Sequence, residues 1–257
     1  MTFQDRLVDA VLCGRALLPG FIQVEPGIEA MIDAVRWDVR EALDYGLDVD
    51  KVAAQLGTDP DVILNASGQR YWIRFGVSAR TAQQIADALG LTLSTAILED
   101  WIHKMAPKKL RARTFSPDHY RIDALETMIS HSIAIDARIR EAQLKPDELR
   151  STIGKAWILD VNLDRGAKAV NYGWYDPAAP YLSVTGIKLW QSVGTRHNAD
   201  HADYSQTLRL IRTSTRDPAK LLPNYANRYP LPARVPGVAI EDHDTERPPP
   251  PKDDRID

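Results

Sequence analysis

The chain has 257 residues, of which 44% are hydrophobic, so it can bury a sizeable core and is not disordered throughout. Its 32 basic and 35 acidic side chains leave a formal net charge of −3, which argues against a basic nucleic-acid coat protein. Cys13 is the only cysteine, which excludes an intramolecular disulfide and a thiolate metal cluster. No apolar run approaches the roughly 20 residues that span a bilayer, and no signal-peptide pattern opens the chain. We therefore expect a soluble, cytoplasmic protein.

Residues 1–106 predict a mostly helical region with an excess of acidic side chains. Apolar residues at helical spacing predict a helix over residues 27–45, which Gly46 ends. Further elements are expected as helices over residues 51–56, 79–89 and 92–105 and as a short strand over residues 71–75.

Residues 107–119 are a basic segment with prolines, which we interpret as a connector. Residues 120–213 then predict an α+β region. Its expected elements are a long helix over residues 120–144, strands over residues 156–159, 169–175 and 182–190, and a last helix that begins within residues 200–203 and runs to about Arg212.

Residues 214–257 are proline-rich and too poor in apolar side chains to form a core of their own. We expect residues 219–238 to dock in extended form on a preformed surface and residues 241–257 to stay mobile. The predicted fold class is α+β, with a mostly helical N-terminal region, a long central helix, a small antiparallel sheet with a C-terminal helix, and an extended tail.

The densest polar segment covers residues 197–206. If it were all helical, His197, His201 and Tyr204 would share one face. Two imidazoles four residues apart can bind one divalent metal such as zinc, with Asp200 or Asp203 orienting a ring nitrogen. Alternatively, Asp203 and Gln206 form a helix-capping pattern, and both histidines then lie on the loop before the helix.

Two further features are candidates for the same site. His131 lies mid-helix beside an apolar stripe, either as a structural hydrogen-bonding residue or as a base, orienting group or third ligand with the other two histidines. The strand residues Asn171, Tyr172 and Trp174 beside a glycine are typical either of a pocket wall for a sugar, base or peptide or of core packing.

Several short motifs together resemble a group of uncharacterised bacterial and phage-associated proteins. The matching pieces lie within residues 78–212 and are Thr81–Gly90, His131-Ser132, Lys155-x-Trp157, Asn171-Tyr172-Gly173-Trp174, His197 and His201-x-Asp203-Tyr204-Ser205-Gln206. The last piece is the most specific. In that group a histidine commonly follows the Asn-Tyr-Gly-Trp piece, whereas this chain has Tyr175. Any function of that histidine is therefore lost here.

The resemblance brings no known reaction with it and names no substrate. Our leading hypothesis from the polar residues is a hydrolase, and by analogy phage association makes bacterial cell-wall peptide or glycan its expected substrate. The expected catalytic residues are His131, His197, His201 and Asp203, the expected substrate-binding residues are Asn171, Tyr172, Trp174 and Tyr204, and the possible metal ligands are His197 and His201. The alternative is a non-catalytic virion or assembly protein, in which the helical region and the tail contact other subunits, including copies of the same chain. Either protein could be virion-associated.

A third interpretation is a helix-turn-helix protein, because residues 52–66 and 85–101 resemble parts of that motif. A recognition helix needs side chains that read bases and contact phosphates. The first candidate helix is acidic and apolar and the second lacks basic residues, so we do not expect nucleic acid as a partner.

Overall fold

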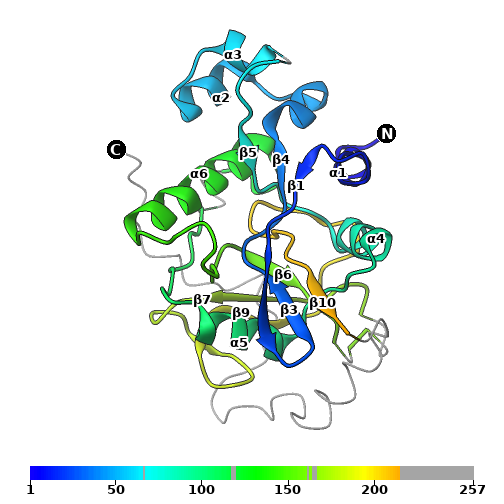
Figure 1. Cartoon of the computed structure of the whole chain (residues 1–257), viewed down its shortest axis with the longest axis vertical. Helices are drawn as coiled ribbons and strands as arrows, with labels where there is room; N and C mark the ends of the chain where they lie inside the picture. The colour runs from blue at the N-terminus through cyan, green and yellow to red at the C-terminus, as the bar shows by residue number, and fades with distance from the viewer. Residues whose placement is uncertain (66, 117–119, 161, 164–166, 215–257) are drawn as a thin grey trace.

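The computed structural model describes residues 1–65, 67–116, 120–160, 162–163 and 167–214, and this part of the chain has an α+β fold (Figure 1). The helices are α1 (Phe3–Leu12), the 3-10 helix η1 (Val39–Tyr45), α2 (Val49–Leu56), α3 (Pro60–Leu64), α4 (Ala79–Leu89), α5 (Ala96–Met105) and α6 (Leu125–Glu141). The strands are β1 (Ala16–Leu17), β2 (Phe21–Glu25), β3 (Ile28–Met31), β4 (Arg36–Asp38), β5 (Trp72–Ile73), β6 (Lys155–Trp157), β7 (Asn171–Tyr175), β8 (Tyr181–Leu182), β9 (Lys188–Gly194) and β10 (Ile211–Thr213). The predicted docking and mobile segments of the tail lie outside the described residues.

The strands pair in small antiparallel sheets. Their orders are β1-β4-β5, β10-β3-β2 and β6-β7-β9-β8. The predicted antiparallel sheet after the central helix is confirmed, and its third expected strand is a hairpin of β8 and β9. In Figure 1, α2 and α3 lie at one end of the molecule, whereas α5 and the β6–β9 sheet lie toward the other.

Strand β10 joins the two ends of the described chain. Ile211 lies opposite Ala30 of β3, so this late segment completes a sheet that begins with the N-terminal hairpin. The largest hydrophobic cluster likewise combines Trp37, Ile129 and Leu210 from distant parts of the sequence. Residues 1–106 and 120–213 therefore share one core.

The basic connector also contributes to that core. Leu110, Ala112 and Phe115 are buried, and the exposed fraction of each is at most 9%. The backbone of this segment is anchored from α6, because the guanidinium of Arg138 donates to the carbonyl of Ala112 at 2.9 Å. Hydrophobic burial therefore fixes residues 110–115 against the rest of the protein.

Local sequence signals predicted several helices correctly. The expected helices at 51–56, 79–89 and 92–105 correspond to α2, α4 and α5, and that at 120–144 to the shorter α6. Helix α4 illustrates the cause: the Ser78 hydroxyl accepts a hydrogen bond from the Thr81 backbone N–H at its start. At its end Gly90 adopts φ 64°, a left-handed conformation that glycine reaches at low cost.

The predicted helix over residues 27–45 is wrong. This segment contains β3, β4 and η1, although Gly46 does end it as expected, with φ 82°. Apolar residues spaced four apart fit a strand–turn–strand path as well as a helix, so periodicity alone does not separate the two. The deciding interaction is non-local, because β3 is paired on both sides, by the adjacent hairpin strand β2 and by the distant β10.

The predicted last helix, from residues 200–203 to Arg212, is also wrong. Residues 203–210 form an irregular segment, and β10 follows at Ile211. The whole run from Asp203 to Ile211 is buried, including its polar members. A helix that is buried on every face is apolar all round, so this polar segment instead bonds to several surrounding segments.

A buried ionic network holds α6 against the N-terminal half. Arg74, with no exposed surface, donates from Nε and Nη2 to the two carboxylate oxygens of Asp33 at 2.8 and 2.7 Å. Its Nη1 donates to Asp136 of α6 at 2.9 Å. Burial alone would raise the pKa of the Asp33 carboxyl, but Arg74 and Arg36 outweigh burial and lower it.

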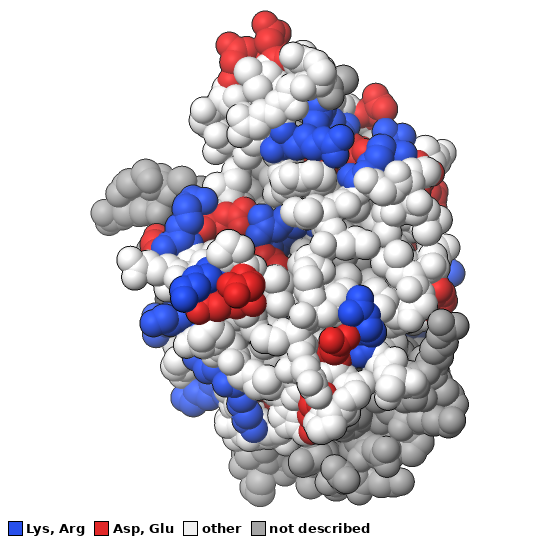
Figure 2. Space-filling view, viewed as in Figure 1, with Lys and Arg blue, Asp and Glu red and all other residues white. Residues whose placement is uncertain are grey.

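Elsewhere the charge is dispersed. On the face shown in Figure 2, basic and acidic side chains lie in small mixed groups separated by uncharged surface. Such a surface has no extended field of one sign on that face. Among the described residues, no helix is both long enough and apolar enough to cross a membrane.

Candidate functional site

Residues 203–206 form a tight polar turn. The Asp203 carboxylate accepts hydrogen bonds from the Ser205 backbone N–H at 2.8 Å and from the Ser205 hydroxyl. The Gln206 side-chain oxygen accepts from the Asp203 backbone N–H at 2.8 Å. The bond from the Ser205 N–H is that of an Asx turn, and the bond to Gln206 is the return half of a capping box, formed here at a turn that no helix follows.

Two glycines make room for this turn. A Cβ atom at Gly76 would lie 2.0 Å from the Asp203 carbonyl oxygen, and one at Gly154 would lie 2.6 Å from the Ser205 carbonyl oxygen. The backbone N–H groups of the residues that follow these glycines, Val77 and Lys155, donate to Gln206 and Ser205 at 2.9 and 2.6 Å. The turn is therefore inserted between two segments that only glycine allows to approach so closely.

The turn places a buried carboxylate beside a partly exposed imidazole. His201 Nε2 lies 3.3 Å from Asp203 Oδ2, and the exposed fractions of the two side chains are 28% and 6%. Lys155 Nζ lies 3.7 Å from the same oxygen. Burial alone would raise the pKa of Asp203, but Lys155 and the hydrogen bonds from His201 and Ser205 hold it well below its usual range.

This geometry assigns a chemical capacity to His201. With Nε2 donating to the ionised Asp203, Nδ1 of the neutral ring holds the lone pair that can accept a proton. The negative charge of Asp203 then stabilises the imidazolium that forms. Together they form a His–Asp dyad of the kind that performs general acid–base catalysis.

His197 lies against the same dyad, although the segment is not helical. The His197 and His201 rings stack at a centroid distance of 4.2 Å with an angle of 10° between their planes. The other side of His197 meets Trp157, edge to face, at 5.9 Å. The loop is anchored to α4, because the Arg80 backbone N–H donates to the Ala199 carbonyl at 2.9 Å and the Arg80 guanidinium pairs with Asp200 at 2.6 Å.

The stacked arrangement limits the zinc hypothesis. A zinc ion needs nitrogen ligands at about 2.0–2.1 Å whose ring planes converge on the ion. Nearly parallel stacked rings do not converge, so one imidazole would have to leave the stack. Among the described residues, no group of three or more His, Cys, Asp or Glu side chains is placed to hold a metal ion.

His131 lies elsewhere, inside the core. It has no exposed surface, and its ring is surrounded by the aromatic rings of Tyr204, Phe115 and Trp174 at 5.1, 6.1 and 6.4 Å. Neither ring nitrogen has a hydrogen-bond partner among the described residues. Burial, with a smaller contribution from the positive charge of Arg74, lowers the pKa of His131 to about 3.

We expect His131 to make the protein sensitive to acid. In the unfolded chain its pKa is about 6.5. Between that pH and 3 the unfolded state binds a proton that the folded state does not, so stability falls as the pH falls. From pH 7 to pH 4.5 the loss amounts to about 2–3 kcal/mol.

His131→Leu, which is close in volume and uncharged, should remove this part of the pH dependence. Denaturant unfolding of wild type and variant at both pH values measures it. Equal losses of stability in the two proteins would show that His131 binds a proton in the folded state as readily as in the unfolded one.

The four predicted substrate-binding residues are also buried. Asn171, Tyr172, Trp174 and Tyr204 have exposed fractions of at most 5%, so none is a wall of an open pocket in this structure. The Tyr204 hydroxyl accepts a hydrogen bond from the Phe115 backbone N–H at 2.8 Å. Trp174 lies under Lys155, whose Nζ is 5.3 Å from the centre of the ring.

The backbone of β7 explains where its tyrosines point. Tyr172 and Tyr175 would face opposite sides of a regular strand, but the two residues between them, Gly173 and Trp174, have φ values of 121° and 69°, outside the extended range of a strand. Both hydroxyls then donate to Asp100 of α5, at 2.9 and 2.7 Å. Tyr175 is thus a buried residue that ties β7 to α5.

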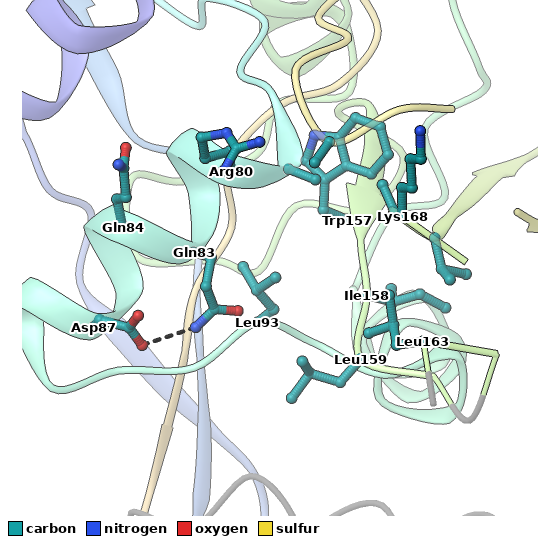
Figure 3. Close-up of a pocket in the computed structure, with 14 residues that line it drawn as sticks. Arg80, Gln83, Gln84, Asp87, Leu93, Trp157, Ile158, Leu159, Leu163 and Lys168 are labelled. Atoms are coloured by element: carbon teal, nitrogen blue, oxygen red, sulfur yellow. Dashed lines mark hydrogen bonds between the residues drawn. The ribbon is translucent and has the colours of Figure 1, made fainter. Parts of the chain in front are cut away.

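A cleft of about 370 Å³ opens between α4 and the β6 region (Figure 3). Its walls are mostly apolar, and Trp157 forms part of them next to His197. Its polar lining residues are Arg80, Gln83, Gln84, Asp87 and Lys168. Pockets of 300–1,000 Å³ with a few polar groups are the usual size for small-molecule sites. The dyad and the cleft are thus neighbours through the Trp157–His197–His201 ring contacts.

Sequence reasoning named His197, His201 and Asp203 together but missed the residues that surround them. Lys155 appeared only in the Lys155-x-Trp157 piece of the resemblance, with no role beside Asp203, and no local motif marks the cleft residues Arg80 and Lys168. The close approach of Gly76 and Gly154 to the turn also depends on the tertiary fold.

No known protein family, curated protein or solved structure gives a significant match to this chain.

Proposed function

We propose that the protein is a hydrolase in which His201 and Asp203 form the acid–base dyad. The observation that carries the proposal is the buried Asp203 carboxylate, held by Lys155 and Ser205, beside a partly exposed imidazole. A histidine whose ring is held by a fixed carboxylate can accept and return a proton without leaving its position.

In the proposed reaction, His201 Nδ1 takes a proton from a water molecule while the water oxygen bonds to the electrophilic carbon of the substrate. The bond from that carbon to the leaving group then breaks, and the imidazolium returns the proton to the leaving nitrogen or oxygen. Asp203 stays ionised throughout and holds the ring in one tautomer. One water molecule is consumed: its hydroxyl group ends on the attacked carbon and its other hydrogen on the leaving group.

Bacterial cell-wall peptide or glycan is the proposed substrate, and this part rests on the resemblance to phage-associated proteins. His131 is not included in the mechanism, because it is buried away from any open surface. His197 is included as the group that packs on His201 and separates it from Trp157.

The test is incubation of the purified protein with purified peptidoglycan. Peptide hydrolysis releases new amino groups, and glycan hydrolysis releases new reducing ends, so the two products are measured separately. We expect one of them to accumulate in proportion to enzyme concentration. Accumulation of neither would contradict the proposed function and would favour the assembly-protein interpretation.

A further inference from the structure

We propose that the cleft between α4 and the β6 region binds the end of a peptide that carries a bulky apolar side chain and a free carboxylate. The inference rests on the proposed function in assigning this ligand as the substrate of the His201–Asp203 dyad. It extends that function by choosing peptide over glycan.

The walls of the cleft favour an apolar group. Most lining residues are aliphatic, including Leu93, Ile158, Leu159 and Val170. A glycan presents many hydroxyl groups, and each needs a hydrogen-bond partner when it is buried. An apolar side chain gains free energy on entering such a cleft, whereas a sugar would lose hydration.

The charges of the cleft favour a carboxylate at one position. Arg80 pairs with Asp200, and Asp87 accepts a hydrogen bond from Gln83 at 2.8 Å. Lys168 is exposed and has no ion-pair or hydrogen-bond partner among the described residues. In the view of Figure 3, Lys168 and Arg80 lie on opposite sides of Trp157, while Gln83 and Asp87 lie on α4. A ligand carboxylate near Lys168 would pair with the one lining cation that has no partner among the described residues.

The cleft lies next to the loop that carries the His201–Asp203 dyad. Ala199 lines it, and this residue lies on the loop between His197 and His201. A peptide whose side chain fills the cleft can therefore extend past Ala199 toward the dyad.

The probes for the experiment are N-acetyl-phenylalanine and its neutral analogue N-acetyl-phenylalaninamide, titrated against the full chain by calorimetry or ligand-observed NMR. Wild type should bind the carboxylate form about fivefold more tightly than the amide, as expected for a solvent-accessible ion pair. In Lys168→Gln the two affinities should become equal. Lys188→Gln, which removes an exposed lysine of β9 outside the cleft, should keep the wild-type ratio.

A second variant tests the apolar part of the site. Gln83 points into the cleft from α4 in Figure 3, so Gln83→Trp should fill it and weaken both probes at least about tenfold. Equal affinities of wild type for the two probes, an unchanged ratio in Lys168→Gln, or undiminished binding in Gln83→Trp would overturn the inference. The inference is also overturned if neither probe binds to wild type.

His201→Asn separates this inference from the proposed function. The variant should bind N-acetyl-phenylalanine as wild type does, because the side chain of His201 does not line the cleft. If wild type does not hydrolyse peptidoglycan while its carboxylate preference persists, the cleft assignment stands and the hydrolase proposal fails. If hydrolysis releases only reducing ends, the dyad stands and the peptide assignment fails.

Discussion

Arg74→Met should destabilise the protein by about 3–5 kcal/mol, the range expected when one partner of a buried ion pair is removed. The substitution leaves the carboxylate of Asp33 buried without its bidentate partner and removes the link to Asp136 of α6. Methionine keeps much of the side-chain length, so the cost comes from charge and hydrogen bonding more than from lost volume. Denaturant unfolding at pH 7 measures it.

Arg121→Met is the matched control. Arg121 also pairs with an aspartate, Asp123, but both side chains are exposed and 3.7 Å apart. Exposed pairs contribute about 0–1 kcal/mol, so this variant should remain close to wild type. Similar losses in the two variants would contradict the view that the buried network holds α6 in place. Adding Asp33→Asn to Arg74→Met should recover part of the loss, because it removes a buried charge that keeps only Arg36 and the more distant Arg150 as partners.

Asp203→Asn should lower the rate of hydrolysis about 100-fold or more, within the range that a general base and its orienting carboxylate contribute. An asparagine amide can present its NH₂ to Nε2, which favours the tautomer with the proton on Nδ1 and blocks proton acceptance there. The exposed Asp123→Asn is the control and should retain full activity.

Asp203→Asn should also change the pH dependence of protein stability, which can be measured without a substrate. Because the folded state lowers the pKa of Asp203, the charged carboxylate stabilises the protein above pH of about 4, and this contribution is lost as the pH falls below that value. The stability difference between wild type and Asp203→Asn should therefore shrink in acid. A difference that stays constant from pH 7 to pH 3 would show that Asp203 is not ionised as the structure implies.

Sequence signals predicted correctly those features that depend on residues close together in the chain. Helix α4 begins at a capping serine and ends at a left-handed glycine, and both are visible in the sequence. The contact of His201 with Asp203 was also predictable, because the two residues are separated by a single position. The capping pattern of Asp203 with Gln206 was recognised as well, but it closes a turn and not a helix.

The features that could not be predicted depend on contacts between residues far apart in the chain. Strand β3 and the segment after His201 were both predicted as helices, and each is fixed by partners far along the chain. His131 looked like a member of the histidine site, but the fold places it among aromatic rings in the core. Lys155, which sets the charge state of Asp203, is a single lysine whose role depends entirely on the approach of the turn to β6.

The rate of peptidoglycan hydrolysis by His201→Asn, compared with wild type at equal concentrations of folded protein, tests the central claim most directly. His201 is partly exposed and packs mainly on His197, so its replacement should leave the fold intact. The dyad predicts a loss of about 100-fold or more with unchanged unfolding behaviour. A variant that hydrolyses peptidoglycan at the wild-type rate would show that His201 is not the catalytic base.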